Sequence, residues 1–374
     1  MKNINIMWNI STICNFNCDH CSYANKITNK NFLNKNQIFK IIKKLNDAQK
    51  KIDKDIKVGL IGAEPTQLTF FKKVVKKLYY SNLKIGITSN GGKKGKIIEV
   101  LPYIDELTIS LDGPTKKYHE ITRPKGSFKI VSQNIKEISK KIKSMDKEIL
   151  FSINCVINNK NYIVIDEMIS FAKNLGVDSI NLLQNIPIGN AKEKDYELEV
   201  KNHLESVKKV AQEYSKKSKS ISINARFTRP LAKDYSKKVL GLDFPKHIHG
   251  CGAGSYFGLI TKEGNLYPCD RFDPNVYKEK YFGEQNYSLL DKKFFEIWNM
   301  KLFHHSYTIE NKKETFLNYY PCMNCKYLGI DCTPCPAQLI QENKFGHSII
   351  CEAFLEKIYE EDKYEEKHCK ERRY

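Results

Sequence analysis

Two kinds of apolar pattern alternate along the first half of the chain. The short apolar runs, of the kind that form strands, are NINIMWNI, KVGLIG, LKIGITSNG, ELTISLDGP, EILFSINCVIN and VDSINLLQ. Between these runs lie longer segments in which apolar residues recur every three or four positions, as on one face of a helix. Strands that alternate with helices predict a parallel sheet covered by helices. Right-handed connections would curl this sheet into a partial (β/α)6, TIM-like barrel, so the predicted fold class is α/β.

The rest of the chain has a different pattern. Residues 185–245 contain few strand-like runs, one long polar helix and a lysine-rich connection, and we interpret them as a bridging region. Residues 246–374 are rich in cysteine, glycine and tyrosine, in short segments without a clear period. That pattern is typical of a small domain held together by metal rather than by a large apolar core. The predicted organisation is a barrel domain at 1–184, the bridge, and a small Cys-rich α+β domain at 246–374.

The overall composition favours a soluble globular protein over a membrane or secreted one. Hydrophobic residues make up 41% of the 374 positions and charged residues 28%, as in ordinary soluble proteins. No apolar run approaches the ~20 residues that span a bilayer, and the N-terminus is too polar for a signal peptide. We therefore expect a cytoplasmic protein without a membrane partner. The net charge of +19 comes mostly from lysines at helical spacing, which favours a solvated surface over a nucleic-acid groove.

Cysteine is the residue whose placement is most informative. The chain has 12 cysteines, and in a reducing compartment clustered thiols bind metal or react rather than form disulfides. Cys155 lies in a strand-like run and is predicted to be a buried structural thiol, whereas Cys369 lies in a charged tail and is predicted to be a free surface thiol. The others gather near the two ends of the chain, at positions 14, 18 and 21 and at positions 251, 269, 322, 325, 332, 335 and 351.

The N-terminal group, Cys14, Cys18 and Cys21, has the spacing Cys-x3-Cys-x2-Cys. Structural zinc needs four protein ligands, one more than this loop offers. A 4Fe–4S cluster takes one ligand per iron, so three thiolates would leave one iron open to another molecule. The alternatives are a zinc site with one ligand elsewhere in the chain, or three structural cysteines.

Other polar segments follow the ends of the predicted strands. The three cysteines follow the first strand, residues 62–65 the second, residues 88–92 the third and residues 110–114 the fourth. Ligand sites on parallel sheets lie at the carboxyl ends of the strands. We therefore expect all four segments at one open face of the barrel.

This arrangement resembles the radical S-adenosylmethionine (radical SAM) superfamily. The resemblance implies that Cys14, Cys18 and Cys21 hold a 4Fe–4S cluster whose open iron chelates the amino and carboxylate groups of S-adenosylmethionine. One electron would then cleave the adjacent C–S bond and release a 5′-deoxyadenosyl radical, which abstracts hydrogen from a substrate. His20 stands where the family usually has an aromatic residue that shields the cluster, and an exposed loop histidine is the other interpretation.

Three further segments carry the same resemblance. GAEP resembles the family's Gly-Gly-Glu-Pro motif, with alanine for the second glycine, and Glu64 would bind the ammonium group of S-adenosylmethionine. SLDGP and the later YHEITRP imply that Ser110 and Asp112 face the cofactor and that Arg123 pairs with its carboxylate. LLQNIPIGNAK matches the last-strand region, in which Leu182, or the leucine after it, would contact adenine through the backbone.

The C-terminal cysteines resemble the SPASM extension of radical SAM enzymes. They read CGAGSYFGLITKEGNLYPC, then CMNCKYLGIDCTPC, then one last cysteine. The resemblance implies two auxiliary 4Fe–4S clusters, the first held by Cys251, Cys269 and Cys335 and the second by Cys322, Cys325, Cys332 and Cys351. The first set leaves either an open iron or a fourth ligand of another kind. The tail spacing of x2, x6 and x2 departs from the usual x2, x5 and x3, and zinc on the two Cys-x2-Cys pairs is the alternative.

Asp270 directly follows Cys269 in YPCDRF. A carboxylate beside an auxiliary cluster could accept the proton that is released when a substrate radical is oxidised. An aspartate here resembles the base of anaerobic sulfatase-maturating enzymes. A turn or capping aspartate is the alternative interpretation.

The resemblance also indicates a class of reaction, because auxiliary clusters suit the removal of a net two electrons. It predicts an enzyme that forms a thioether or carbon–carbon crosslink in a peptide or protein, with flavodoxin or ferredoxin as reductant. Alternatives are the conversion of Ser or Cys to formylglycine, oxidation of a sugar or other small molecule, and a non-enzymatic zinc-binding module. The cluster loop starts at residue 14, so we expect a leader peptide to be recognised by a separate protein or by the bridge, with the basic surface attracting an acidic leader.

Overall fold

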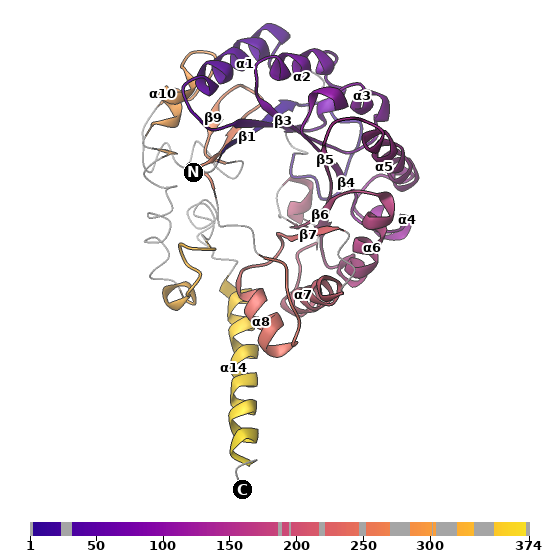
Figure 1. The fold of residues 1–374 in the computed structure, drawn as a ribbon, viewed down its shortest axis with the longest axis vertical. Helices are drawn as coiled ribbons and strands as arrows, with labels where there is room; N and C mark the ends of the chain where they lie inside the picture. Colours follow the sequence, from indigo (N-terminus) through magenta and orange to yellow (C-terminus); the bar gives the residue numbers. More distant parts are fainter. Residues whose placement is uncertain are drawn as a thin grey trace.

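The computed structural model describes residues 3–23, 32–185, 189–193, 196–216, 221–246, 252–269, 285–300, 302–303, 320–332 and 348–371. Within these ranges a curved 9-stranded sheet has the order β7-β6-β5-β4-β3-β2-β1-β8-β9, and its strands follow one another around an arc (Figure 1). The strands are β1 (Ile4–Ser11), β2 (Ile56–Gly62), β3 (Lys84–Ser89), β4 (Glu106–Ser110), β5 (Leu150–Ile157), β6 (Ser179–Gln184), β7 (Ser222–Ala225), β8 (Phe257–Ile260) and β9 (Leu266–Tyr267).

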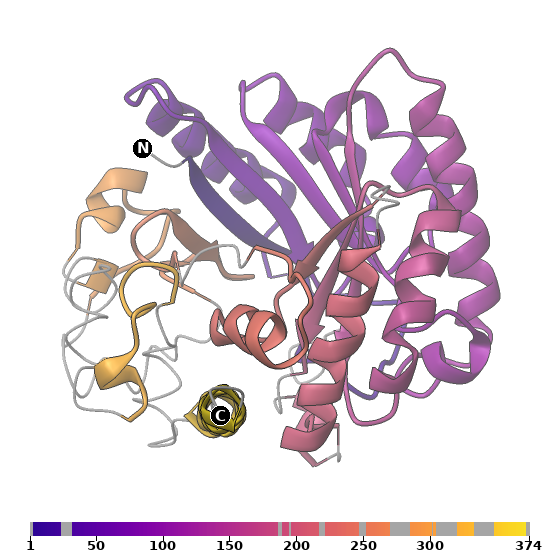
Figure 2. The same ribbon diagram turned by 60° about the horizontal axis from the view of Figure 1, so that its bottom comes forward.

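All neighbouring strands from β7 to β8 are parallel, and β9 pairs antiparallel with β8. Helices follow the strands and cover the outer side of the arc (Figure 1). The predicted α/β class and partial barrel are therefore confirmed. In Figure 2 the described C-terminal segments drawn in orange lie on the opposite side of the barrel from the helices that cover β4 to β6.

The helices in the described ranges vary from single turns to one of 24 residues. The α-helices are α1 (Lys35–Gln49), α2 (Phe71–Tyr79), α3 (Lys94–Ile98), α4 (Lys116–His119), α5 (Ser127–Lys143), α6 (Ile165–Leu175), α7 (Val200–Ser215), α8 (Leu231–Val239), α10 (Phe294–Trp298) and α14 (Ser348–Glu371). The 3-10 helices are η2 (Pro65–Gln67), η3 (Leu101–Tyr103), η4 (Tyr162–Val164), η5 (Gly189–Glu193) and η7 (Cys322–Asn324). A search of the described ranges for a helix with the length and apolarity to traverse a lipid bilayer found none.

The apolar pattern explains how α1 and β1 pack. In α1 the residues Ile38, Ile41, Ile42 and Leu45 recur at helical spacing and are fully buried. Asn34 caps the helix, since its side chain accepts a hydrogen bond from the backbone of Gln37 while the Gln37 side chain accepts one from the backbone of Asn34. In β1 alternate apolar residues, Ile4, Ile6, Trp8 and Ile10, are buried in the core.

One sheet runs across both of the boundaries predicted from the sequence. β7 comes from the bridging region and pairs in parallel with β6. β8 comes from the Cys-rich region and pairs in parallel with β1. Each of these strands has only four residues, too short a run to show a strand period in the sequence. The division at 184/185 and 245/246 therefore does not coincide with the edges of the sheet.

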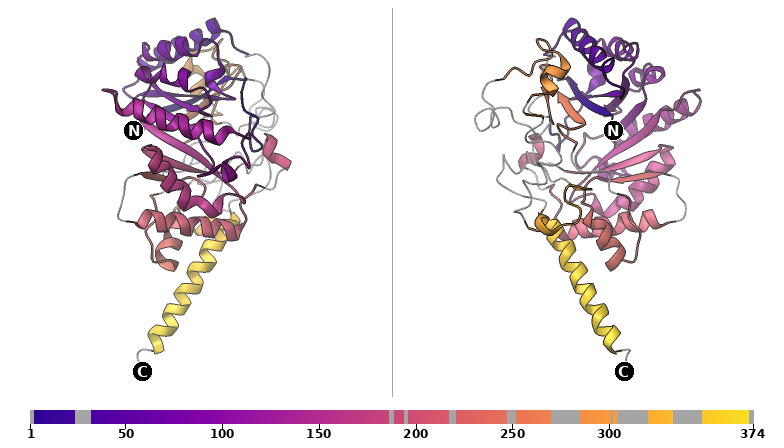
Figure 3. Two further views of the ribbon diagram at one scale, coloured as in Figure 1. Left: turned by 90° about the vertical axis from the view of Figure 1, so that its right-hand side faces the viewer. Right: turned by 60° about the vertical axis from the view of Figure 1, so that its left-hand side comes forward.

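The last helix, α14, joins the C-terminal part of the chain to the barrel. It packs on α8 and α7 at its N-terminal end and extends away from the body of the protein in both views of Figure 3. Phe354 of α14 is fully buried, with its ring 6.1 Å from that of His203 and 5.3 Å from that of Tyr235. His203 also contacts the ring of Phe227 at 5.3 Å. This aromatic cluster fixes the helix that carries Cys351.

We predict that His203 makes the protein less stable in acid. Burial, together with the charge of Arg229, lowers the pKa of His203 to about 3. A histidine in the unfolded chain has a pKa of ~6.5. Above that pH the neutral His203 does not reduce the free energy of unfolding. As the pH falls from ~6.5 toward 3, the free energy of unfolding decreases by up to about 1.4 kcal/mol per pH unit. His203→Leu cannot be protonated, so its midpoint of thermal unfolding should fall less than that of the wild type between pH 7 and pH 5. Equal falls in the two proteins would contradict this role.

Candidate active site

The cysteine loop begins directly after β1 and is fixed to the segment that follows β4. The backbone N–H of Asp19 donates to the carbonyl of Thr122 at 2.8 Å, and the N–H of Cys21 donates to the carbonyl of Cys18 at 3.2 Å. The N–H of Phe16 points at Cys14 Sγ, 3.3 Å away. The thiols of the loop are therefore held at the carboxyl edge of the sheet, where the sequence predicted them.

The three thiols are close enough to affect one another electrostatically. Burial is the main cause that raises the pKa of Cys18 to about 12, and negative charge on Cys21 and Cys14 contributes to this rise. Burial also raises the pKa of Cys14, and Glu64 and Cys21 add to that effect. Within the described ranges, no three His, Cys, Asp or Glu side chains are gathered tightly enough to bind a single metal ion. Three thiolates on three irons of one cluster lie further apart than ligands of a single ion, and a positively charged iron core would offset their repulsion.

Glu64 lies directly after β2 and is 1% exposed. Its Oε1 accepts hydrogen bonds from Thr66 Oγ1 at 2.7 Å, from the Thr66 N–H at 3.1 Å and from Ser89 Oγ at 2.9 Å. Its Oε2 accepts one hydrogen bond, from the N–H of Asn90 at 2.7 Å. Burial raises the pKa of this carboxyl, while the hydrogen bonds lower it.

Glu64 forms no ion pair with any described residue, although it is buried. A buried carboxylate is costly unless a cation compensates it, and Oε2 has capacity for one more donor. Asn90 connects this carboxylate to the cysteine loop, because its Nδ2 donates to Asn15 Oδ1 at 3.0 Å and lies 3.7 Å from Cys14 Sγ. A ligand with an ammonium group next to a metal cluster therefore fits these residues.

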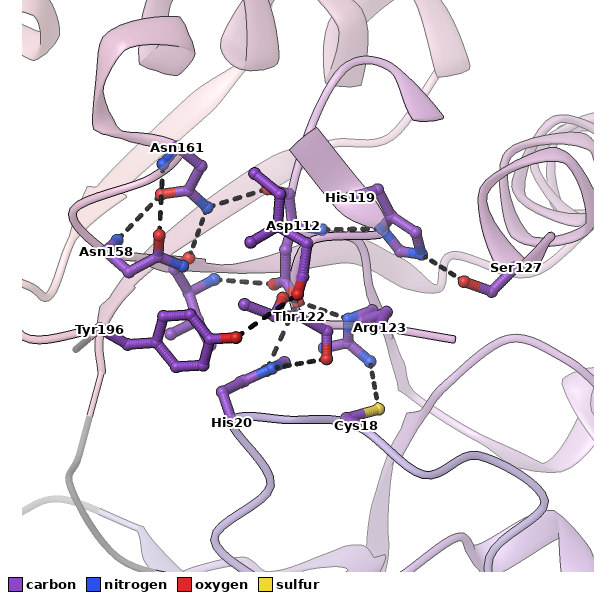
Figure 4. A network of polar contacts seen from close by, with 12 residues as sticks. Cys18, His20, Asp112, His119, Thr122, Arg123, Ser127, Asn158, Asn161 and Tyr196 are labelled. Atoms are coloured by element: carbon purple, nitrogen blue, oxygen red, sulfur yellow. Dashed lines mark hydrogen bonds and ion pairs between the residues drawn. The ribbon is translucent and has the colours of Figure 1, made fainter. Parts of the chain in front are cut away.

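Asp112 and Arg123 form a buried ion pair next to the cysteine loop (Figure 4). Asp112 follows β4, is 0% exposed and accepts hydrogen bonds from Arg123 Nε and from the N–H of Val156, the latter at 2.9 Å. Burial alone would raise the pKa of Asp112, but Arg123 and then His20 and His119 lower it to about 2. Burial would lower the pKa of Arg123, yet the pair with Asp112 raises it overall. Both groups are charged in the folded protein.

Arg123 reaches from this pair to the cysteine loop. One of its terminal nitrogens, Nη1, lies 4.0 Å from Cys18 Sγ (Figure 4). His20 lies on the other side of Asp112, with Nδ1 3.3 Å from the Thr122 carbonyl and Nε2 3.4 Å from Asp112 Oδ2. The His20 side chain is 9% exposed, so the interpretation of His20 as an exposed loop histidine is wrong.

Four of the C-terminal cysteines line one cavity. Cys322, Cys325 and Cys332 come from the segment 320–332 and Cys351 from α14, and Arg229 lies among them. Burial raises the pKa of Cys322 and of Cys351 to about 12, and the charge of Arg229 lowers both. The four thiols are those that the sequence grouped as the second auxiliary set. Four thiols around one cavity fit a 4Fe–4S cluster, whereas these four described thiols are not gathered tightly enough for a single zinc ion.

The comparison with protein families settles the class of the barrel. The sequence profile described as the Radical SAM superfamily matches residues 8–172, which include the cysteine loop, Glu64 and the Asp112–Arg123 pair. The chain carries a radical SAM domain. Proteins with this domain are enzymes that use a 4Fe–4S cluster and S-adenosylmethionine, and the matched domain of this chain is of that kind. The chain spans 66% and 57% of the length of two curated relatives that it matches.

Individual relatives of the radical SAM protein differ in their named reactions. A cysteine-type anaerobic sulfatase-maturating enzyme of Clostridium novyi is 24% identical over 92% of this chain and 91% of the relative. A probable GTP 3′,8-cyclase of Sulfurisphaera tokodaii is 27% identical over 59% of this chain and 66% of the relative. Streptococcus suis SuiB, solved with S-adenosylmethionine, has a TM-score of 0.68 and 16% identity over 92% of this chain and 75% of SuiB. A further SuiB structure contains its precursor peptide SuiA.

Other predicted residues of the radical SAM domain lie at the same edge or in the sheet. Ser110 ends β4 and is partly exposed, whereas the side chain of Leu182 is fully buried in β6. Asp112 differs from the expectation that it faces the cofactor, because its carboxylate is enclosed by protein donors. Cys155 is buried, as predicted. Three predicted residues, Cys251, Asp270 and Cys335, lie outside the described residues, as does the side chain of Cys369, and Cys269 is buried just after β9.

The sequence alone did not reveal the residues that hold the charged groups in place. His119 Nδ1 accepts from the backbone N–H of Asp112 at 3.2 Å, and His119 Nε2 lies 3.1 Å from Ser127 Oγ. Asn161 Nδ2 donates to the carbonyl of Asp112 at 2.9 Å (Figure 4). His119 lies in the YHEITRP segment, but only the arginine of that segment matched the motif. Asn161 lies beyond β5, and no spacing rule connects it to Asp112.

Proposed function

We propose that this enzyme cleaves S-adenosylmethionine reductively and oxidises a side chain of a peptide or protein substrate. When bound, the 4Fe–4S cluster supplies the electron for this cleavage, which yields a 5′-deoxyadenosyl radical that abstracts hydrogen from the substrate. Cys14, Cys18 and Cys21 would hold that cluster. The observation that carries the proposal is the buried Glu64 carboxylate, which has no cation among the described residues and is linked through Asn90 to Cys14.

The residues around the cluster loop would bind and orient S-adenosylmethionine. Glu64 Oε2 would accept a charge-assisted hydrogen bond from the ammonium group, and Thr66, Ser89 and Asn90 keep the carboxylate from rotating. A fixed carboxylate needs no reorganisation when the ligand binds, which favours affinity.

Arg123 would pair with the carboxylate of S-adenosylmethionine. Asp112 occupies its Nε, so the terminal nitrogens remain for the ligand, and Asp112 is a positioning residue in this proposal. Ser110 at the end of β4 and the backbone of Leu182 in β6 would flank the rest of the cofactor.

The C-terminal cysteines would hold two auxiliary clusters. Cys322, Cys325, Cys332 and Cys351 would bind one, and Cys251, Cys269 and Cys335 the other, with Asp270 as the group that accepts a proton from the oxidised substrate. Arg229 lines the cavity of the four thiols and also a cavity on the inner side of the barrel. A substrate in that inner cavity would therefore lie near the second auxiliary site. A cluster in that site could accept the second electron of a net two-electron oxidation.

The substrate class rests on the kind of proteins that this chain resembles. SuiB was solved with a precursor peptide, and the Clostridium novyi relative is named for the maturation of a sulfatase. The lead function is a thioether or carbon–carbon crosslink, with a flavodoxin- or ferredoxin-type protein as reductant. The second candidate is conversion of Ser or Cys to formylglycine, which the alignment over 92% of this chain favours. A crosslink and the conversion of Ser to formylglycine each remove two hydrogens, whereas the conversion of Cys also replaces sulfur with oxygen. Only formylglycine carries an aldehyde that reacts with hydrazides, so mass spectrometry after hydrazide labelling separates the two functions.

We predict that the double variant Cys322→Ala/Cys351→Ala loses one cluster. Iron in the reconstituted protein should fall from about twelve to about eight atoms per chain, because each 4Fe–4S cluster holds four. Iron and sulfide analysis, with zinc measured in the same samples, is the test. Cys155→Ala is the control, since Cys155 is a buried thiol of β5 that belongs to neither predicted ligand group. Unchanged iron in the double variant, or the loss of one zinc instead, would contradict an iron–sulfur site here.

A further inference from the structure

A cavity of about 510 Å³ lies on the inner side of the barrel. Asn5 and Met7 of β1 and Lys57 of β2 line one wall, and Asn224 of β7 with Arg226 and Lys246 lines the other. This volume lies in the range of cavities that bind small molecules or single peptide side chains.

Among the described residues, the charged groups that line this cavity are all positive. They are Lys57, Arg226, Arg229 and Lys246. Lys57 is already compensated, because its Nζ forms an ion pair with Glu106 of β4. Arg229 also faces the four C-terminal thiols and acts on their pKa values. Arg226 and Lys246 are therefore the two cations that remain for a ligand.

Arg226 is the more distinctive of the two. Its guanidinium forms no hydrogen bond or ion pair with any residue in the described part of the chain. Burial lowers its pKa, and the charge of Glu106 offsets only part of that effect. The Arg226 side chain is exposed to this cavity, so a guanidinium without a hydrogen-bonded partner in the described part of the chain is available to an anion.

The backbone around Arg226 is held rigidly. Asn224 Nδ2 donates to Asn181 Oδ1 at 2.9 Å, and Asn181 Nδ2 donates to Asn154 Oδ1 at 2.9 Å, so an amide ladder crosses β7, β6 and β5. The N–H of Arg226 donates to the carbonyl of Asn224 at 3.0 Å, which turns the chain at the end of β7. The backbone that carries the Arg226 guanidinium is therefore fixed in position, which favours specific recognition of a ligand.

We propose that this cavity binds the carboxylate of an aspartate or glutamate in the substrate peptide, through the planar fork of Arg226. A guanidinium binds a carboxylate through two parallel hydrogen bonds, and Lys246 adds a second positive charge. Two available cations match one carboxylate better than a nucleoside triphosphate, which carries about four negative charges at neutral pH. This inference rests on the proposed peptide substrate and adds to it that the peptide carries an acidic residue, which this cavity receives.

The test uses the reconstituted holoenzyme with S-adenosylmethionine and four mixtures of C-terminally amidated peptides. The mixtures differ in one central position, fixed as Glu, Asp, Gln or Asn, and mass spectrometry measures the peptides retained by the protein. The wild type should retain the acidic mixtures about tenfold better than the amide mixtures, since a hydrogen bond between charged groups contributes about 1.5 kcal/mol or more. Arg226→Gln should abolish this preference, and Arg226→Lys should keep a part of it. The control is Lys237→Gln, an exposed cation on α8, which should behave as the wild type.

Three outcomes would overturn the inference. They are an absent acidic preference in the wild type, an undiminished preference in Arg226→Gln, and GTP binding that depends on Arg226 without any preference for acidic peptides. If Arg226→Gln does not fold, the test uses Arg226→Lys instead. An undiminished preference for acidic peptides in Arg226→Lys would exclude recognition by the guanidinium fork. Formation of 5′-deoxyadenosine by the wild type in the same preparation separates this inference from the proposed function. If that reaction is absent the proposed function fails, whereas cleavage without an acidic preference contradicts the inference alone.

Discussion

Glu64→Gln should lower the affinity for S-adenosylmethionine by about ten- to a hundredfold. Glutamine has nearly the same shape, and one of its two terminal atoms can still accept from Thr66 and Ser89. It carries no charge, and its amide nitrogen would face the N–H of Asn90, where Oε2 now accepts. A charge-assisted hydrogen bond contributes about 1.5–3 kcal/mol, which corresponds to roughly this loss of affinity.

Equilibrium binding of S-adenosylmethionine to the anaerobically reconstituted protein measures this effect. Glu99→Gln is a matched control, because Glu99 is 54% exposed and pairs with Lys72 on the surface at 3.4 Å. The thermal unfolding midpoint of Glu64→Gln without ligand should not fall sharply, because the substitution removes a buried charge that has no counter-ion. Wild-type affinity in Glu64→Gln would contradict the role of the carboxylate. A collapse of the midpoint would show that Glu64 acts in folding instead.

The sequence located the site because parallel sheets gather ligand residues at one edge. The first four predicted strands are present at the predicted places, and Cys14 and Glu64 follow β1 and β2 within three residues. Arg123 comes 13 residues after the end of β4. Apolar runs of five or more residues are long enough to identify such strands. β7 and β8, with four residues each, are not.

The contacts of Asp112 and Arg123 could not be read from the sequence. The motif indicated that both belong to the site, but not that they bind each other. That pairing depends on Val156, His119 and Asn161, which come from three different segments. The packing of the whole barrel brings these partners together. No local pattern in the sequence indicates which residues will meet. The same holds for Arg226, because only the structure shows that no residue in the described ranges forms a hydrogen bond or ion pair with its guanidinium.

The grouping of the C-terminal thiols could be predicted only in part from the sequence. Cys351 lies on α14, and the other three members of its set lie in the segment 320–332. Their grouping came from the resemblance to a known domain, because the spacing alone also allows a zinc site on the two Cys-x2-Cys pairs. The structure adds that these four thiols share one cavity with Arg229. Only metal analysis separates iron from zinc there.

The central claim is that the thiols after β1 hold the cluster that cleaves S-adenosylmethionine. We predict that the triple variant Cys14→Ala/Cys18→Ala/Cys21→Ala loses about four of about twelve irons and all cleavage of S-adenosylmethionine. The fold should persist, because the loop remains held by backbone hydrogen bonds such as that from Asp19 to Thr122. Cys155→Ala, which removes a thiol from the core of the sheet, is again the control.

The most direct measurement is the yield of 5′-deoxyadenosine from S-adenosylmethionine after reduction with dithionite, with iron counted in the same samples. The account predicts formation of 5′-deoxyadenosine by the wild type and by Cys155→Ala, and none by the triple variant with about eight irons left. A wild type that holds zinc and leaves S-adenosylmethionine intact would contradict the account. So would a triple variant that retains all its iron and still forms 5′-deoxyadenosine.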